Sequence, residues 1–433
     1  QINVPRDYWT QVIDIELPTI IRMERNSGGA QAVKSAAELL SSAKFPVILS
    51  GAGVILADAI DDCKALAEKL DAPVACGYQH NDSFPGSHPL AIGPLGYNGS
   101  KAAMEIISKA DVVLALGTRL NPFSTLPGYG IDYWPKQASI IQVDINSDRI
   151  GLAKKITVGI CGDAKLVTQQ ILEQLSSSAG DEGREERRAL IHQTKSAWLQ
   201  TLTSLDHEED DPGTTWNKDS RERDPERMSP RVAWRAIQAG IPQDAIISSD
   251  IGNNCAIGNA YPTFEKGRKY LAPGLFGPCG YGFPSILGAK IGCPNTPVIG
   301  FAGDGAFGIS MSEMTSCNRK EWPNITMVIF RNYQWGAEKR NSILWYDNNF
   351  VGTELDPELS YAKIAEACGS KGVEVKTPSE LTEAIKTSCV EQQKGITTFI
   401  EVILNQELGE PFRRDAMKKP VHVAGINSGD MQN

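Results

Sequence analysis

Short apolar runs alternate with helix-like stretches along two long parts of the chain. Between residues 25 and 180, runs such as FPVILSG (45–51) lie among stretches with helical spacing such as AQAVKSAAELLSSA (30–43). From residue 229 to 433 the same alternation returns, for example in ITMVIFRN (325–332). Strands that are apolar on both faces and alternate with helices are typical of a parallel sheet covered by helices. The pattern predicts an α/β fold with two doubly wound parallel-sheet domains.

The stretch between these two parts, residues 181–228, has a different composition. It is rich in charged residues, glycine and proline, as in DHEEDDPGTTWNKDSRERDPER (206–227). One helix is predicted inside it, over ERRALIHQTKSAWLQTL (186–202). The composition therefore predicts a charged linker that separates a central domain (25–180) from a C-terminal domain (229–433).

Composition narrows the class of protein. The 433 residues carry a formal net charge of −9, which argues against non-specific nucleic-acid binding, since that requires clustered Lys and Arg. No apolar run approaches the ~20 residues of a membrane span. The nine cysteines form no CxxC pair, and most lie in apolar segments, which predicts reduced thiols in a cytoplasmic protein.

Candidate chemistry lies at the ends of two consecutive predicted strands of the C-terminal domain. PVIGFAGD ends at Asp304, and ITMVIFRN ends at Asn332, 28 residues later. A right-handed crossover would make these strands parallel, so both side chains should lie at the carboxyl edge of one sheet, where open α/β sheets bind ligands. One carboxylate and one amide oxygen suit Mg²⁺, which prefers hard oxygen ligands and a shell completed by phosphate and water.

The glycines around Asp304 extend this prediction to a second group. Gly303 and Gly305 allow the backbone to approach a diphosphate closely, and the following helix would present its N-terminal amides to that anion. Gly-Asp-Gly alone is also a common turn, so the prediction depends on the strand context and on the second ligand. Together these features predict a diphosphate bridged by Mg²⁺.

Several phrases of this domain resemble one superfamily, the thiamine diphosphate (TPP)-dependent enzymes. Gly-Asp-Gly followed by a strand-terminal Asn resembles the superfamily's metal motif. SDIGNN (249–254) is similar to its diphosphate loop, GPCGYG (277–282) to its cofactor-facing turn, and GFPSILGAK (282–290) to the helix before the motif. The resemblance implies TPP and Mg²⁺ as cofactors and a TPP-binding C-terminal domain.

The resemblance also implies roles for individual residues. Asp304 and the Asn332 side chain would bind Mg²⁺ together with the backbone carbonyl of Gln334, and the Gly277 carbonyl would accept a hydrogen bond from the cofactor's amino group. The whole implied cofactor-binding set is Gly252, Asn253, Asn254, Gly277, Cys279, Gly303, Asp304, Gly305, Ala306, Asn332 and Gly336.

Two positions depart from the superfamily's pattern. Cys279 falls where a larger apolar side chain usually supports the bent cofactor, and Cys is smaller, which puts this support in question. Arg331 replaces the first Asn of the usual Asn-Asn pair, while the metal-binding second Asn, Asn332, is kept.

The remaining parts resemble other regions of the same superfamily. Residues 25–180 are similar to its central domain, in which some members hold FAD or a nucleotide; here the SGAGV stretch (50–54) and Arg119 could touch such a ligand, although a purely structural domain is the favoured reading. Residues 1–24 resemble the end of a pyrimidine-binding domain and its exit. The activating Glu would then lie upstream of Gln1, so no catalytic residue is expected in this chain, and we expect the chain alone to be inactive.

Longer phrases such as FRNYQWGAEKRN (330–341) resemble one branch of the superfamily, the sulfoacetaldehyde acetyltransferases. This implies conversion of sulfoacetaldehyde and phosphate to acetyl phosphate and sulfite by a homodimer or homotetramer. Both substrates are anions, and Arg413 and Arg414 are the first candidates to bind them, followed by Lys339 and Arg340. Two alternatives stay open: an acetolactate synthase or 2-oxo-acid decarboxylase, and a catalytically incomplete cofactor-binding fragment.

Overall fold

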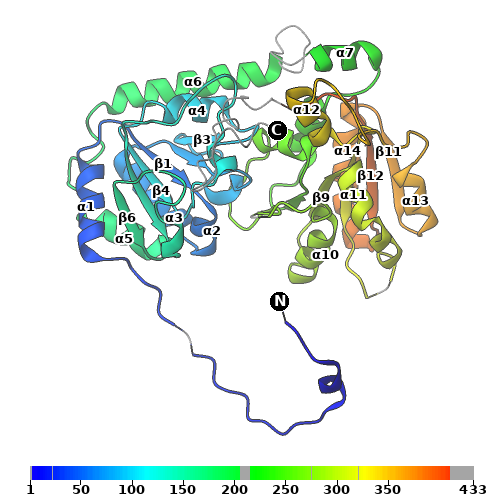
Figure 1. The fold of residues 1–433 in the computed structure, drawn as a ribbon, viewed down its shortest axis with the longest axis horizontal. Coiled ribbons are helices and arrows are strands. Elements are labelled where there is room, and N and C mark those ends of the chain that lie inside the picture. Colours follow the sequence, from blue (N-terminus) through cyan, green and yellow to red (C-terminus); the bar gives the residue numbers. More distant parts are fainter. Residues whose placement is uncertain (1, 22, 205–214, 275, 320, 410–433) are drawn as a thin grey trace, which may run out of the picture.

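Two six-stranded parallel sheets organise the chain (Figure 1). The computed structural model describes residues 2–21, 23–204, 215–274, 276–319 and 321–409. All strand pairs in both sheets are parallel. The predicted α/β class with two doubly wound domains is therefore confirmed.

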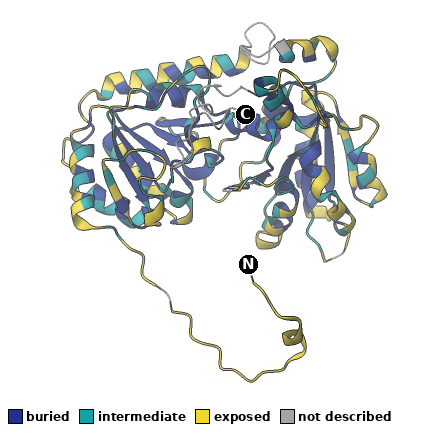
Figure 2. Cartoon of the chain, viewed as in Figure 1, coloured by how far each residue is buried: buried dark blue, intermediate teal, exposed yellow. Residues whose placement is uncertain are grey.

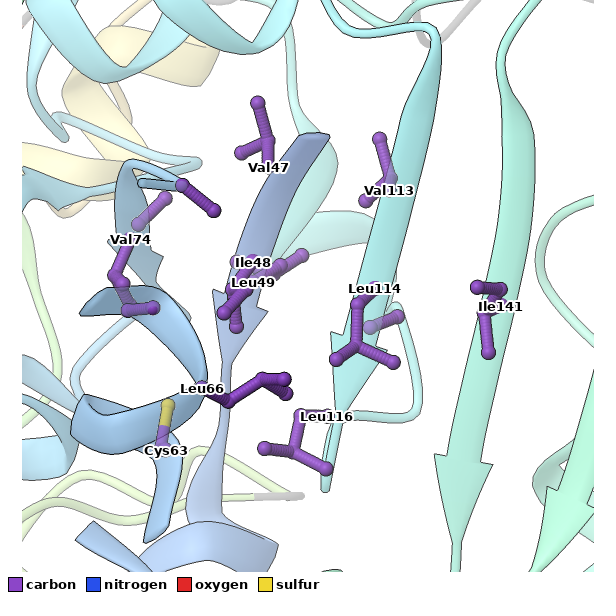
Figure 3. Close-up of a cluster of buried hydrophobic side chains, with 14 of the residues drawn as sticks. Val47, Ile48, Leu49, Cys63, Leu66, Val74, Val113, Leu114, Leu116 and Ile141 are labelled. Carbon is purple, nitrogen blue, oxygen red and sulfur yellow. The ribbon is translucent and has the colours of Figure 1, made fainter. Parts of the chain in front are cut away.

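The central domain contains the first sheet, in the order β3-β2-β1-β4-β5-β6. Its strands are β1 (Pro46–Ser50), β2 (Val74–Cys76), β3 (Ala91–Pro94), β4 (Val112–Leu116), β5 (Ser139–Asp144) and β6 (Val158–Cys161). Its helices are α1 (Ala30–Ser41), α2 (Ala52–Leu56), α3 (Ile60–Leu70), α4 (Lys101–Ile107) and α5 (Ala164–Gln174). Strands β1 and β4 are buried at every position, and their apolar side chains belong to one buried cluster with Cys63 and Leu66 of α3 (Figure 3).

The C-terminal domain contains the second sheet, in the order β11-β12-β10-β9-β7-β8. Its strands are β7 (Ile246–Ser249), β8 (Tyr270–Leu271), β9 (Val298–Gly303), β10 (Thr326–Arg331), β11 (Lys371–Val375) and β12 (Thr398–Ile403). Its helices are α8 (Pro230–Gly240), α9 (Asn253–Ile257), α10 (Gly282–Gly292), α11 (Asp304–Ser310), α12 (Gly336–Trp345), α13 (Tyr361–Ala367) and α14 (Pro378–Glu391).

Helices cover both faces of this second sheet because its strands are apolar on both sides (Figure 2). Along β10, Val328 and Phe330 pack into a cluster with Trp234 of α8 and residues of α14. The alternate residues Met327 and Ile329 pack into a second cluster with α10, α11 and α13. This arrangement leaves the strand ends as the places where polar side chains can gather.

The predicted helix of the charged linker is present as α6 (Arg184–Ser204), and a further helix, α7 (Thr215–Arg223), follows it. Arg187 of α6 is completely buried and donates five hydrogen bonds to carbonyls. The acceptors are Asp71 (3.1 Å), Lys44 (2.7 Å), Glu182 (2.7 Å), Leu70 (3.2 Å) and Gly180 (2.7 Å). One guanidinium thus joins α6 to the C-terminal end of α3, where a positive charge is favourable.

The first described residues lie away from both sheets (Figure 1). Residues 2–21 contain a short 3₁₀ turn (Arg6–Thr10), and no strand is found in this described segment. Its apolar side chains are exposed, for example Val12 at 98% and Ile20 at 87%. Among the helices that the structure describes, none has both the length and the apolar character needed to cross a bilayer.

Candidate cofactor and metal site

Asp304 and Asn332 lie at the same edge of the C-terminal sheet. Strands β9 and β10 are parallel neighbours, and Gly303 pairs with Phe330 at their carboxyl ends. Asp304 follows Gly303 directly, and Asn332 lies two residues after Phe330. The Tyr333 backbone amide donates to Asp304 Oδ2 at 2.7 Å. The predicted juxtaposition of the two strand ends is therefore present.

The Asp304 carboxylate is buried and held by three donors. Oδ1 accepts from the Gly305 amide at 3.0 Å, and Oδ2 accepts from the Tyr333 amide and from Arg331 Nη1 at 3.1 Å. Burial raises the pKa of Asp304 to about 6, while the Tyr333 amide and the Arg331 guanidinium act in the opposite direction. A carboxylate has about four acceptor positions, so one remains for a further ligand.

Two further candidate oxygen ligands follow β10, Asn332 directly and Gln334 two residues later. The Asn332 side chain makes no hydrogen bond within the described residues, and its Nδ2 atom is fully buried. A half-turn of an amide exchanges its oxygen and nitrogen, so either atom can face a ligand. The Gln334 carbonyl likewise accepts no hydrogen bond from the described residues. In the antiparallel bridge between Gln334 and Glu354, the Trp335 amide donates to the Thr353 carbonyl, and the Tyr333 carbonyl accepts from the Leu355 amide.

These donors fit a hard divalent cation. The Asn332 Oδ1 accepts no hydrogen bond within the described residues and can therefore ligate a cation, whereas its buried Nδ2 is a donor that still requires an acceptor. Within the described ranges, no group of three or more His, Cys, Asp or Glu side chains is placed to hold a metal ion. The donor set is one carboxylate, one amide and one carbonyl, which suits Mg²⁺ better than a transition metal.

Asp250 organises the turn that was predicted to face the cofactor, although the sequence prediction gave Asp250 no role. It follows β7, and its buried carboxylate accepts from the amides of Ile251 (2.8 Å), Gly280 (3.1 Å) and Gly282 (2.7 Å). Within this turn Gly277 has φ +68°, a conformation that favours glycine, and its carbonyl accepts no hydrogen bond from the described part of the chain. The sequence signal that could have identified Asp250 is an acidic residue directly after a buried strand.

The glycines of the metal motif have different surroundings. A side chain at Gly303 would meet no atom of the described residues within 4 Å, whereas one at Gly305 would lie 2.9 Å from the Trp335 ring. Gly303 therefore borders open space, and Gly305 accommodates an indole. Ala306 is buried in the first turn of α11, and Cys279 is half-buried.

Asn253 contacts a buried segment of the chain, residues 405–409, which we call the strap. Its Nδ2 donates to the Glu407 carbonyl at 3.2 Å, and its Oδ1 accepts from the Gly409 amide at 2.8 Å. Gln334 Nε2 donates to the strap at the Gln406 carbonyl, 3.0 Å away. The Asn253 amide is thus already engaged, although it was predicted to bind the cofactor.

The neighbouring candidates of that loop remain open to a ligand. Asn254 has a buried Oδ1 atom without a hydrogen-bond partner in the described chain. Gly252 has φ +123°, and a side chain there would meet no atom of the described residues within 4 Å, while Gly336 packs against Asn253 and Leu408. The Asn253 amide is engaged, whereas the Asn254 side chain makes no hydrogen bond within the described residues, so its Nδ2 group, and not the acceptor Oδ1, can donate to a diphosphate.

We expect Asn253→Ala to loosen the strap. Two hydrogen bonds at roughly 0.5–1.5 kcal/mol each are lost, so opening of residues 405–409 should become roughly 5- to 150-fold more frequent. Hydrogen exchange of the strap amides, followed by mass spectrometry, measures this. Asn254→Ala is the matched control and should leave strap exchange unchanged; equal exchange in the two variants would contradict the assignment.

The predicted cationic candidates fall into three groups. Arg413 and Arg414 lie outside the described residues. Lys339 is completely buried, forms an ion pair with Glu354, and lies 4.6 Å from the centre of the Trp216 ring. Arg340 is buried with its guanidinium 4.7 Å from the centre of the Tyr97 ring, and burial lowers its pKa to about 10. Lys339 is therefore already paired with Glu354 inside the fold.

The glycines of the central domain's SGAGV stretch have a packing explanation. A side chain at Gly51 would lie 2.6 Å from the Gly117 carbonyl, and one at Gly53 would lie 2.6 Å from the Gly117 Cα. The ends of β1 and β4 thus approach closely enough to require glycine. This contact favours the structural reading of these glycines over ligand binding.

Family models place the two parallel-sheet domains among the thiamine diphosphate-dependent enzymes. "Thiamine pyrophosphate enzyme, central domain" matches residues 33–172, and "Thiamine pyrophosphate enzyme, C-terminal TPP binding domain" matches residues 250–402.

Individual relatives narrow the class. A probable sulfoacetaldehyde acetyltransferase of Rhizobium meliloti is 76% identical over 432 residues, which cover 100% of this chain and 73% of the relative. A sulfoacetaldehyde acetyltransferase of Roseovarius nubinhibens is 71% identical, with 100% and 72% covered. A probable acetolactate synthase large subunit of Methanococcus aeolicus is 28% identical, with 89% and 64% covered. The chain belongs to the sulfoacetaldehyde acetyltransferase family.

Proposed function

We propose that the protein is a TPP- and Mg²⁺-dependent acetyltransferase that converts sulfoacetaldehyde and phosphate into acetyl phosphate and sulfite. The proposed dependence on TPP and Mg²⁺ rests on one observation, the three oxygen ligands at the ends of adjoining strands. Identities of 76% and 71% to relatives named for this activity support the substrate part, against 28% for the acetolactate synthase.

In this proposal Asp304, Asn332 and the Gln334 carbonyl hold Mg²⁺, and the diphosphate completes the shell. Their support is the remaining acceptor position of Asp304, together with the Asn332 side chain and the Gln334 carbonyl, which make no hydrogen bond within the described residues. The open space beside Gly303 gives the diphosphate room. Gly252 and Asn254 would contact the diphosphate from the β7 side.

The Gly277 carbonyl would accept a hydrogen bond from the cofactor's amino group. Its support is the absence of another donor to it in the described chain, and Asp250 fixes the turn that carries it. Cys279, in the same turn, would contact the cofactor ring. When bound, TPP supplies a nucleophilic carbon and an electron sink for chemistry beside a carbonyl.

The overall conversion balances without an external oxidant. The carbon–sulfur bond breaks and sulfite leaves with its electron pair, while the aldehyde carbon rises to the acyl level and the neighbouring carbon becomes a methyl group. A bond then forms between the acyl carbon and a phosphate oxygen. Both substrates are anions, so the site needs fixed cations, and Arg413 and Arg414 remain the proposed substrate-binding residues.

The test is an assay of the intact protein with TPP, Mg²⁺, sulfoacetaldehyde and phosphate. We expect sulfite and acetyl phosphate in equal amounts, and acetyl phosphate only when phosphate is present. Pyruvate replaces sulfoacetaldehyde in a parallel reaction. Turnover of pyruvate without sulfite release from sulfoacetaldehyde would favour the acetolactate synthase or decarboxylase alternative.

A calorimetric titration addresses the alternative of a catalytically incomplete fragment. Calorimetry of the 433-residue chain with TPP and Mg²⁺ measures binding independently of turnover. Binding without turnover would support a cofactor-binding fragment, and absence of binding would contradict the site itself. The homodimer or homotetramer and the cytoplasmic location stay predictions.

A further inference from the structure

Arg331 occupies a buried position directly beside the proposed metal ligand. It is the last residue of β10, is 1% exposed, and immediately precedes Asn332. Its Nη1 lies 3.1 Å from Asp304 Oδ2, and its Nε lies 3.5 Å from Glu401 Oε1. Three charged groups with net charge −1 are therefore buried together at the strand edge.

The guanidinium is fixed on its remaining sides. Nη2 donates to the carbonyls of Asp356 and Leu359, the latter at 2.9 Å. The Tyr333 ring lies across its face, with its centre 4.3 Å from Cζ. Because the planar fork is held by carbonyls, carboxylates and a ring together, it has one available orientation.

Glu401 is itself held in place. Its Oε2 accepts from Ser360 Oγ at 2.7 Å and from the Ala362 amide at 3.0 Å. Its other oxygen, Oε1, is therefore directed to Arg331. The charges of Arg331 and Glu401 offset one another, which leaves the negative charge of Asp304 available to a cation.

We propose that Arg331 is a positioning residue for Asp304. With the Tyr333 amide, it occupies Oδ2 and thereby makes Oδ1 the oxygen that faces the cation. Oδ1 accepts only from the Gly305 amide within the described residues, so it keeps an acceptor position. This inference rests on the proposed metal site. It explains how an arginine can stand beside a divalent cation: Glu401 balances its charge.

The test compares Mn²⁺ binding by electron paramagnetic resonance in the presence of TPP, with Mn²⁺ as a probe for Mg²⁺. In Arg331→Lys the charge remains, but an ammonium cannot span both carboxylates and the two carbonyls. We expect roughly 10- to 100-fold weaker Mn²⁺ binding, as for loss of an outer-shell partner, and a changed line shape of the bound ion.

Arg227→Lys is the matched control. Arg227 stacks on the same Tyr333 ring, with its guanidinium 4.7 Å from the ring centre, but makes no contact with Asp304. We expect its Mn²⁺ affinity to stay within about threefold of the wild type, because it is not an outer-shell partner. Thermal melting of both variants without cofactor reports whether the fold is intact.

The outcomes separate the inference from the proposed function. If the wild type binds no Mn²⁺ with TPP, the metal site is wrong. If the wild type binds and Arg331→Lys binds equally well, the inference is wrong. If Arg331→Lys does not fold, Mn²⁺ binding to Glu401→Gln tests the inference instead. This variant removes the charge that balances Arg331 but keeps an amide oxygen that can accept from Ser360 and Ala362. We then expect roughly tenfold weaker Mn²⁺ binding, and unchanged binding would contradict the inference.

Discussion

Asp304→Asn is expected to abolish Mg²⁺-dependent TPP binding while the fold survives. The substitution removes the one carboxylate among the three proposed ligands and keeps the size of the side chain. The loss should exceed the roughly 10- to 100-fold effect of an outer-shell partner, so we expect affinity to fall by more than about 100-fold. Calorimetric titration of TPP at saturating Mg²⁺ measures it.

The fold should survive because the charges that remain are balanced. Without the Asp304 charge, Arg331 still pairs with Glu401, and no buried carboxylate is left alone. Asp356→Asn is the control: Asp356 is exposed, and only its backbone carbonyl contacts Arg331. Wild-type TPP affinity in Asp304→Asn, with Asp356→Asn also normal, would remove Asp304 from the metal site.

Arg187→Met should strongly lower the free energy of unfolding. Five carbonyls lose their donor at once, and the C-terminal end of α3 loses its positive charge. Breaking a buried charged network costs about 3–5 kcal/mol of unfolding free energy, which lowers the melting temperature by roughly 6–20 °C for a domain of this size. Circular dichroism during heating measures the shift.

Arg184→Met supplies the comparison for this prediction. Arg184 lies on the same helix, one turn earlier, with its side chain 35% exposed and a surface ion pair to Asp181 at 2.9 Å. Such pairs contribute about 0–1 kcal/mol, so its melting temperature should fall by only a few degrees. Equal losses in Arg184→Met and Arg187→Met would show that the five carbonyl contacts contribute little.

The metal motif was predictable because its signals are local. The apolar runs that end at Asp304 and Asn332 specify strands, and the helical stretch between them specifies a crossover, which brings the two ends to one edge. The start of α8 is equally local: Ser229 caps the helix by accepting from the Val232 amide at 3.2 Å, as Ser-Pro predicts.

Other elements lacked such signals. The strands β3, β8 and β11 were not predicted, since they are short or partly exposed: β8 has two residues, and β11 is buried only at Val375. The roles of Asp250 and Asn253 were also missed in part. Both depend on contacts with segments more than 25 residues away, which no local pattern encodes.

The sequence by itself determined the α/β class, the two domains' alternation of strands and helices, and the residues at the strand ends, because periodicity and terminal residues act over a few positions. Only the tertiary structure decided which polar groups are already satisfied. Arg331 lies between Asp304 and Glu401, Asn253 is engaged by the strap, and the Asn332 side chain makes no hydrogen bond within the described residues. The physical reason is that a buried polar group is defined by its neighbours in space, and those neighbours come from distant parts of the chain.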